Sequence, residues 1–168
     1  MSTHEHKKSA PRRVTLGILT ISTTRTLKTD KSGLWIGKQA RKEGHEVIHH
    51  AVIPDDAATI SKSLLDVIRE QQPQAMLLTG GTGISHQDVT IEAVRPLLKK
   101  ELTGFGCLFT QLSFEQIDSA ALMSRATAGI IGNTAVFCMP GSLAACKLAC
   151  GALIFPELGH IARHIQQG

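Results

Sequence analysis

The sequence predicts a three-layer α/β/α protein, in which helices cover a mostly parallel sheet that also contains an antiparallel hairpin. Two observations predict this fold. Short β-prone apolar runs alternate along the chain with amphipathic segments of helical length, as in parallel βαβ units. Near the C-terminus, two β-prone runs are separated only by Gly132-Asn133, which is the spacing of a hairpin.

The first half of the chain supplies three strands and two helices. Residues 14–21, 45–53 and 75–79 are the β-prone runs, and we expect them to be parallel. Apolar residues recur at helical spacing in 34–43, and Gly44 is a fitting C-terminal stop for that helix. A second helix follows Pro54-Asp55-Asp56 and ends before Pro73.

The second half begins with a glycine-rich turn and continues with helices and the hairpin. Residues 89–98 are compatible with a helix that is interrupted near Pro96, and 102–117 predict another. The hairpin strands are 126–131 and 134–139. A last helix runs from Ala144 towards His164, with a kink near Pro156.

The chain divides into a basic arm and one domain. Residues 1–13 carry four basic side chains against one acidic side chain, and therefore hold most of the formal charge of +4. We expect them to form a disordered, solvated arm, and residues 14–168 to form a single domain. The sequence has no secretory leader and no apolar stretch of bilayer-spanning length, so we expect a cytoplasmic protein without a membrane partner.

The stretch Thr79-Gly80-Gly81-Thr82-Gly83 closes an apolar run and precedes a helix. Glycines permit positive φ and close approach of a ligand, and the amides of such a turn cradle phosphate or carboxylate. The stretch is neither a Walker A loop, because no Gly-Lys-Ser/Thr follows, nor a Gly-x-Gly-x-x-Gly dinucleotide motif. A tight strand-to-helix turn without a ligand is the alternative.

Four predicted strand ends carry polar residues: Ser22–Arg25, Pro54-Asp55, Thr79–Gly83 and Pro140-Gly141-Ser142. The carboxyl ends of parallel strands share one edge, so these segments are expected to meet there. Carboxylates at Asp55 and Asp88 beside a phosphate cradle predict a Mg²⁺ ion between them. Asp55, Asp88 and Ser142 can alternatively be helix N-caps, and Arg25 either grips a phosphate or is a surface charge.

Other metal-binding or nucleophilic patterns are weak. The four cysteines form no Cys-x-x-Cys pair, and we expect buried thiols. His160 and His164 have the i, i+4 spacing that can place two ligands on one helix face. Because no His-Glu-x-x-His motif accompanies them, we interpret them as solvated side chains. His86 lies in the glycine-loop segment and can approach a ligand.

Several motifs together resemble the MoaB/MogA family of molybdenum cofactor biosynthesis proteins. The central motif is Leu78-Thr-Gly-Gly-Thr-Gly83, followed by Asp88-x-Thr-x-Glu92. Further matching segments are Arg25 with Thr29-Asp-x-Ser-Gly33, Gly44-His-Glu-Val47, Thr103-Gly-Phe-Gly106, Leu112-Ser-Phe-Glu115, Ser124-Arg-Ala-x-Ala-Gly129 and Met139-Pro-Gly-Ser142. The resemblance runs from about Val14 to the last helix and is closest to the MoaB branch.

This resemblance implies a molybdopterin-binding α/β/α domain that assembles as a homo-oligomer, either a trimer or, in the MoaB branch, a hexamer. The implied reaction is adenylyl transfer: AMP passes from Mg-ATP to the terminal phosphate of molybdopterin, and pyrophosphate is released. ATP and molybdopterin are therefore the implied substrates and Mg²⁺ the implied cofactor. The molybdenum-insertion enzyme of the same pathway is the implied recipient of adenylylated molybdopterin.

The family's two important acids map onto Asp55 and Asp88, which are the predicted catalytic residues and Mg²⁺ ligands. The predicted substrate-binding residues are Ser22, Arg25, Thr79, Gly80, Gly81, Thr82, Gly83, Glu92, Ser124, Arg125, Pro140, Gly141 and Ser142. The chain departs from the family at Thr23, where aspartate is usual, and at Asp118, where glycine is common.

Two other functions are compatible with the sequence. A non-catalytic oligomeric carrier would bind molybdopterin without binding ATP. A nucleic-acid binder would use the basic arm, but aromatic residues make up only 4% of the chain and tyrosine is absent, so few side chains can stack on bases. Nucleic acid is therefore the least favoured partner.

Overall fold

The computed structural model describes residues 13–167. Its elements in chain order are β1 (Thr15–Ile21), α2 (Lys31–Lys42), β2 (Glu46–Ile53), α3 (Ala57–Gln71), β3 (Ala75–Thr79), α4 (Thr90–Val94), η1 (Arg95–Leu97), β4 (Lys100–Glu101), α5 (Thr103–Ile117), η2 (Asp118–Met123), β5 (Thr127–Ile131), β6 (Thr134–Met139), α6 (Leu143–Leu148), η3 (Ala149–Ile154) and α7 (Phe155–Gln166). The predicted basic arm lies outside the described residues except for Arg13, which pairs with Glu46 at 2.8 Å.

The strands form one six-stranded mixed sheet in the order β2-β1-β3-β6-β5-β4. β1, β2, β3 and β6 are parallel, whereas β5 is antiparallel to both β6 and β4. The predicted parallel sheet with a hairpin is therefore confirmed. β4 was not predicted, because a strand of two residues is too short to show an alternating pattern.

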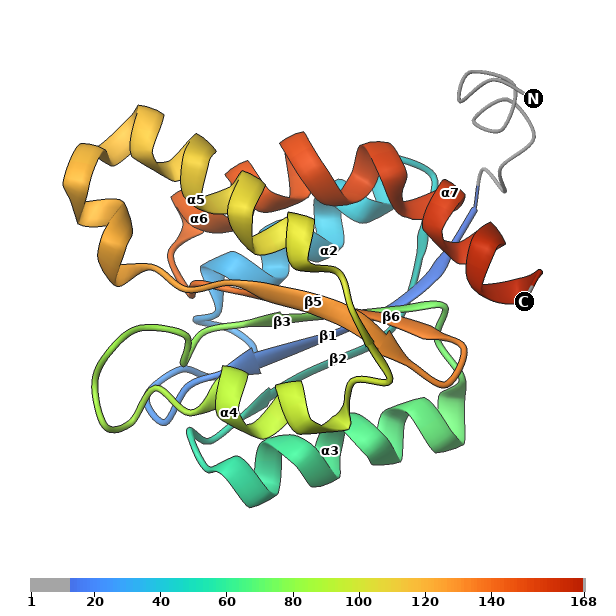
Figure 1. The fold of residues 1–168 in the computed structure, drawn as a ribbon. Coiled ribbons are helices and arrows are strands. Elements are labelled where there is room, and N and C mark those ends of the chain that lie inside the picture. The colour runs from blue at the N-terminus through green and yellow to red at the C-terminus, as the bar shows by residue number, and fades with distance from the viewer. Residues whose placement is uncertain (1–12, 168) are drawn as a thin grey trace.

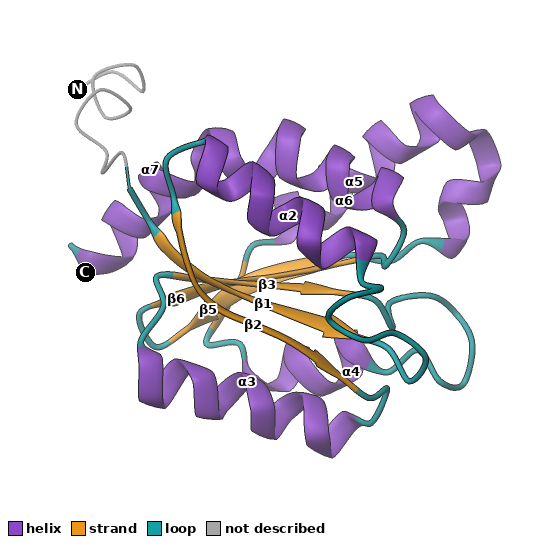
Figure 2. Ribbon diagram, turned by 180° about the vertical axis from the view of Figure 1, so that it is seen from behind, coloured by secondary structure: helices purple, strands orange, loops and turns teal. Residues whose placement is uncertain are grey.

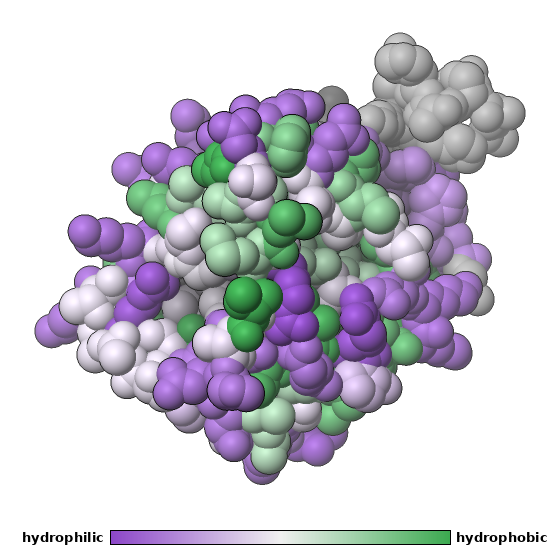
Figure 3. All heavy atoms as spheres, turned by 60° about the vertical axis from the view of Figure 1, so that its left-hand side comes forward, coloured by the Kyte–Doolittle hydropathy of each residue, from purple (hydrophilic) through white to green (hydrophobic). Residues whose placement is uncertain are grey.

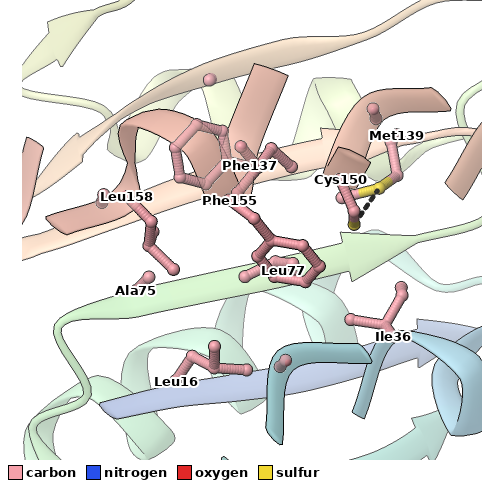
Figure 4. Packing of buried hydrophobic residues seen from close by; sticks show 14 of the residues in the cluster. Leu16, Ile36, Ala75, Leu77, Phe137, Met139, Cys150, Phe155 and Leu158 are labelled. Atoms are coloured by element: carbon pink, nitrogen blue, oxygen red, sulfur yellow. Dashed lines mark hydrogen bonds between the residues drawn. The ribbon is translucent and has the colours of Figure 1, made fainter. Parts of the chain in front are cut away.

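Helices cover both faces of the sheet (Figures 1 and 2). One face packs against α3 and α4, and the other against α2, α5 and the C-terminal helices. The split follows from the period of two in the strands: Leu16 and Ile18 of β1 point to the second face, whereas Leu19 and Ile21 point to the first. Figure 4 shows the core on the second face, where Phe155 and Leu158 of α7 pack over Leu77 of β3.

The last helical segments form one continuous run, Leu143–Gln166, of 24 residues, which contains an 18-residue window with a mean hydropathy of 1.2. By length and composition alone this helix can span a bilayer, so the expectation that no apolar stretch reaches that length is wrong. Its inner face supplies buried residues of the core, from Cys146 to Ala162, and 33% of the apolar window is buried. The irregularity expected near Pro156 is the π-helical stretch η3, which ends just before it.

The bounds of two helices differ from the sequence-based prediction. α2 begins at Lys31 rather than Leu34, because the carboxylate of Asp30 accepts the backbone N–H of Gly33 and caps the helix. The predicted helix at 89–98 is shorter, since α4 ends at Val94 and continues as the 3₁₀ turn η1 around Pro96. Three cysteines are buried as expected, but Cys107 on α5 is exposed.

Candidate functional site

The carboxyl ends of β1, β2, β3 and β6 lie at one edge of the sheet, and the loops that follow them surround a cavity of about 390 Å³. The cavity is lined by Ile21, Ser22, Thr23, Thr24, Arg25, Asp55, Gly80, Gly81, Thr82, Gly83, Gln87, Asp88, Pro140 and Gly141. The four polar strand ends that the sequence analysis placed together therefore do meet. In Figure 1 these loops lie at the left end of the sheet.

The glycine loop owes its shape to two positive φ angles, 103° at Gly80 and 62° at Gly81. A Cβ at Gly80 would lie 2.3 Å from the carbonyl oxygen of Ile21, so only glycine fits between β1 and β3. Thr90, at the start of α4, ties the turn down: its hydroxyl donates to the Gly80 carbonyl at 2.8 Å, and its N–H donates to the Gly81 carbonyl at 2.9 Å. Such a turn forms a concavity suited to anions.

Arg125 is hydrogen-bonded to the glycine loop but does not line the cavity. Its Nε donates to the carbonyls of Thr82 (3.0 Å) and Gly83 (2.9 Å), and its terminal nitrogens form a bidentate pair with Glu92 at 2.5 and 3.2 Å. Its hydrogen bond with Glu92 raises the pKa of Arg125, despite an opposing effect of burial. Arg125 and Glu92, which we expected to bind substrate, do not line the cavity and instead position the loop.

Asp88 follows the glycine loop, and its carboxylate lies next to Gly83. Its Oδ2 accepts hydrogen bonds from the backbone N–H of Ser85 at 2.9 Å and from the Ser85 hydroxyl at 2.7 Å. The hydroxyl bond is the main cause of a lowered Asp88 pKa, because it outweighs partial burial. Asp88 does not cap α4, since the N-cap position is Val89 and no side chain bonds there.

Asp55 enters the cavity from the end of β2. The neighbouring Asp56, rather than Asp55, caps α3 by accepting the N–H of Thr59 at 2.8 Å. The alternative that Asp55 is an N-cap is therefore wrong. A Cβ at Gly81 would lie 3.3 Å from Asp55 Oδ1, and one at Gly83 would lie 2.7 Å from Asp88 Oδ2. Both carboxylates thus occupy space that the glycines leave open.

Arg25 crosses from the end of β1 to the loop after β6, where its Nη1 donates to the Gly141 carbonyl at 3.1 Å. The Ser32 hydroxyl donates to the same oxygen at 2.8 Å. The Ser22 hydroxyl accepts the N–H of Arg25 at 3.2 Å, which stabilises the turn that carries the guanidinium. Arg25 is the only cationic side chain among the residues that line the cavity.

A buried hydrogen-bond network surrounds the carboxylate of Asp30, just before α2. Asp30 is fully buried and accepts hydrogen bonds from Thr20 (2.6 Å) and Gly33 (2.9 Å), while His50 Nε2 lies 3.0 Å from its Oδ2. Burial opposes ionisation of Asp30, but these hydrogen bonds outweigh it and lower its pKa. Sequence analysis did not select Asp30 as a site residue, although its position at the start of α2 is typical of an N-cap.

The structure divides the predicted site residues into two groups. Ten of them line the cavity, namely Ser22, Arg25, Asp55, Gly80, Gly81, Thr82, Gly83, Asp88, Pro140 and Gly141. The other five, Thr79, Glu92, Ser124, Arg125 and Ser142, lie outside its lining. Ser142 caps α6, as its alternative interpretation held, and the Thr79 hydroxyl donates to the Pro140 carbonyl. Gln87 lines the cavity but was missed, because a lone polar loop residue carries no pattern.

The donors present suit a magnesium ion that is shared with phosphate. Within residues 13–167, no three His, Cys, Asp or Glu side chains converge as a complete metal centre. Mg²⁺ is commonly held by one or two carboxylates together with substrate phosphates and water, and Asp55 and Asp88 supply two carboxylates. The Thr82 hydroxyl is buried and has no hydrogen-bond partner among the described residues.

Comparison with known proteins identifies the family. Residues 17–160 match the family described as a probable molybdopterin binding domain. The chain belongs to this family. It is 48% identical to the molybdenum cofactor biosynthesis protein B of Bacillus subtilis, with 99% of each chain aligned, and 42% identical to the protein of that name from Staphylococcus carnosus.

Solved structures of the family have the same fold. A crystal structure of a molybdenum cofactor biosynthesis protein B has a TM-score of 0.92 at 45% identity and covers 95% of this chain and all of that chain. The tungsten cofactor synthesizing protein MoaB from Pyrococcus furiosus has a TM-score of 0.84 at 35% identity, with 94% of this chain and 99% of that chain covered. A MogA structure at 23% identity shares the fold with a TM-score of 0.81. The protein is therefore a MoaB-type member of the MoaB/MogA family and a molybdenum cofactor biosynthesis protein.

Proposed function

We propose that the protein binds molybdopterin and transfers AMP from Mg-ATP to its terminal phosphate. An oxygen of that phosphate attacks the α-phosphorus of ATP, the new P–O bond joins AMP to molybdopterin, and the bond to the β-phosphate breaks to release pyrophosphate. The observation that carries this proposal is the pairing of two carboxylates with a glycine cradle and one arginine in a single cavity. Reactions between two phosphates depend mainly on positioning and charge neutralisation.

Each group has a role that its surroundings support. Asp55 and Asp88 would hold Mg²⁺, which would neutralise phosphate charge when bound. The lowered pKa of Asp88, caused chiefly by the Ser85 hydroxyl, keeps that carboxylate ionised for this task. The amides of the glycine loop and the Arg25 guanidinium would orient the phosphate oxygens, while Arg125 keeps the loop in place.

The proposal extends to the partners of the protein. Adenylylated molybdopterin would pass to the molybdenum-insertion enzyme of the same pathway, and the chain would act in the cytoplasm as a trimer or hexamer. Exposed apolar side chains on α5 and η2 support self-association.

The test compares Asp55→Asn and Asp88→Asn with Asp56→Asn in an assay of pyrophosphate release from Mg-ATP and molybdopterin. Asp56 is the matched control, because it is the adjacent carboxylate and asparagine preserves its N-cap on α3. We expect the first two variants to lose about 100-fold or more in kcat, as when one group that stabilises developing charge is removed, and the control to retain activity.

Wild-type turnover in both the Asp55 and Asp88 variants would refute the assignment. A wild-type protein that binds molybdopterin but neither binds nor turns over ATP would instead identify a non-catalytic carrier.

A further inference from the structure

The C-terminal helix α7 brings two imidazoles together far from the candidate site. His160 and His164 are one helical turn apart, their ring centroids are 4.6 Å apart, and their Nε2 atoms are hydrogen-bonded to each other at 2.9 Å. The side chain of His160 is only 21% exposed. His160 is therefore partly buried, whereas His164 is exposed, as expected for a solvated side chain. In Figure 1, α7 extends to the right, away from the loops of the candidate site at the left.

A carboxylate lies close to the other ring nitrogen of His160. Glu157 Oε2 is 3.4 Å from Nδ1 of His160, one turn earlier on the same helix. A histidine that donates its Nδ1–H to a carboxylate carries the lone pair on Nε2, which is the nitrogen that faces His164. Metal-binding histidines are commonly oriented by a carboxylate on their other ring nitrogen in this way.

The separation of the two Nε2 atoms matches a particular coordination geometry. Metal–imidazole bonds are about 2.0–2.1 Å long, so two such bonds at a right angle place the nitrogens about 2.9 Å apart, and a tetrahedral angle places them about 3.4 Å apart. The two Nε2 atoms, which are hydrogen-bonded at 2.9 Å, already have the separation of the right-angled arrangement, so a metal that replaces the shared proton can bind both with little movement of the rings. Right-angled nitrogen ligation is typical of the tetragonal and octahedral sites of Cu²⁺ and Ni²⁺.

We propose that His160 and His164 form a bis-imidazole site for a divalent late first-row transition metal, with Cu²⁺ or Ni²⁺ preferred. Within the described residues no third His, Cys, Asp or Glu side chain completes a cluster, so water or a small anion fills the other coordination positions. Both histidines line a cavity of about 530 Å³ that gives the metal access to solvent.

The rest of that cavity bears on which metal binds. Its other lining residues are Lys99, Lys100, Leu102, Ile130, Gly132, Asn133, Ile161 and Ile165, which include two ammonium groups. These lysines repel any divalent cation, so binding depends on the strength of the metal–imidazole bonds, and they favour an anion as the additional ligand of the metal. Mg²⁺ prefers oxygen ligands and is therefore excluded, whereas imidazole nitrogen retains Cu²⁺ and Ni²⁺.

The test is calorimetric titration of Ni²⁺ into the full-length protein with Mg²⁺ in large excess, so that the carboxylates of the candidate site stay occupied. His160→Gln and His164→Gln are compared with His86→Gln, an exposed histidine in the glycine-loop segment. Loss of a direct ligand is expected to weaken binding by more than the roughly 10- to 100-fold that loss of an outer partner costs. The His86→Gln variant is expected to bind as the wild type does.

A second set of measurements separates this pair from other imidazoles in the chain. The sequence also contains His4 and His6, so the titrations are repeated in a background with both replaced by glutamine, where strong binding should persist. Cu²⁺ added to that background should give an electron paramagnetic resonance spectrum with hyperfine splitting from two equatorial nitrogens. The proposal is overturned if Ni²⁺ binding survives in His160→Gln and His164→Gln, or disappears with His4 and His6.

Discussion

At the scale of single residues, Asp30 shows how a buried carboxylate organises a site that it does not line. It caps α2, and α2 carries Ser32, whose hydroxyl holds the Gly141 carbonyl in the cavity wall together with Arg25. Gly33 leaves the room for this network, because a Cβ there would lie 2.1 Å from Asp30 Oδ2 and 2.5 Å from His50 Nε2. The position of the Gly141 carbonyl in the cavity wall therefore depends on ionised Asp30.

We predict that Asp30→Ala destabilises the protein by about 2–3 kcal/mol at pH 7, because three donors lose a charged, buried acceptor. The folded-state pKa of Asp30 is lowered below 3.8, so its contribution is complete at neutral pH and is lost as the pH falls below 3.8. Urea unfolding at pH 7 and pH 3 should show the difference between variant and wild type shrinking at the lower pH.

The exposed Glu115 provides a control for the acid dependence, and Glu115→Gln should change neither curve appreciably. An equal loss for Asp30→Ala at both pH values would mean that packing, rather than the ionised carboxylate, carries the effect.

At the scale of elements, the junction between α5 and η2 is strained. Asp118 has φ 50° and ψ −141°, a combination that L-residues rarely adopt, whereas Gln72 at the end of α3 lies in the ordinary left-handed region with φ 48° and ψ 50°. The aspartate thus carries a conformational cost that glycine would remove.

We predict that Asp118→Gly stabilises the protein by about 1 kcal/mol, since relief of backbone strain exceeds the added entropy of the unfolded chain. For a chain of this length, that gain corresponds to a rise of about 2–4 °C in Tm, which differential scanning calorimetry can measure. Asp118→Ala removes the same charge but keeps a Cβ, and should give no such rise. An equal rise in both variants would trace the effect to charge instead of backbone conformation.

The same scale shows what the sequence can reveal about this fold. The alternation of Leu16, Ile18, Leu19 and Ile21 between the two faces is a local pattern, and so the parallel strands were predictable. β4 and the π-helical stretch η3 have no such pattern, because pairing with β5 and packing against the sheet determine them.

The site divides in a similar way. Strand ends and glycines placed Asp55 and the glycine loop correctly at the cavity. The role of Arg125 depends on contacts with residues more than thirty positions away, and no local pattern encodes them. Sequence alone therefore singled out Arg125 but did not show its contacts with the loop, and its substrate-binding role stays a prediction.

At the scale of the whole molecule, one face carries more exposed apolar surface than a monomer needs. Leu108 and Phe114 on α5 are 50% and 56% exposed, and Leu122 and Met123 on η2 are 81% and 54% exposed. Figure 3, which turns the α5 and η2 side of the molecule forward, shows hydrophobic side chains gathered on this face among hydrophilic ones. Contiguous apolar surface of this kind is typical of protein–protein interfaces.

We predict that the wild-type chain elutes as a trimer or hexamer, and that Phe114→Glu combined with Leu122→Glu converts it to monomers. Burial of each large apolar side chain contributes about 2 kcal/mol, and a carboxylate in its place would have to be buried without a partner. Size-exclusion chromatography with light scattering measures the mass directly.

Leu65→Glu is the matched control, because Leu65 is 39% exposed on α3, which covers the other face of the sheet. A monomeric wild type, or equal dissociation by Leu65→Glu, would show that the face formed by α5 and η2 is not the interface. If the double variant is folded, monomeric and inactive, the cavity at the sheet edge depends on assembly; if it is monomeric and active, each chain carries a complete site.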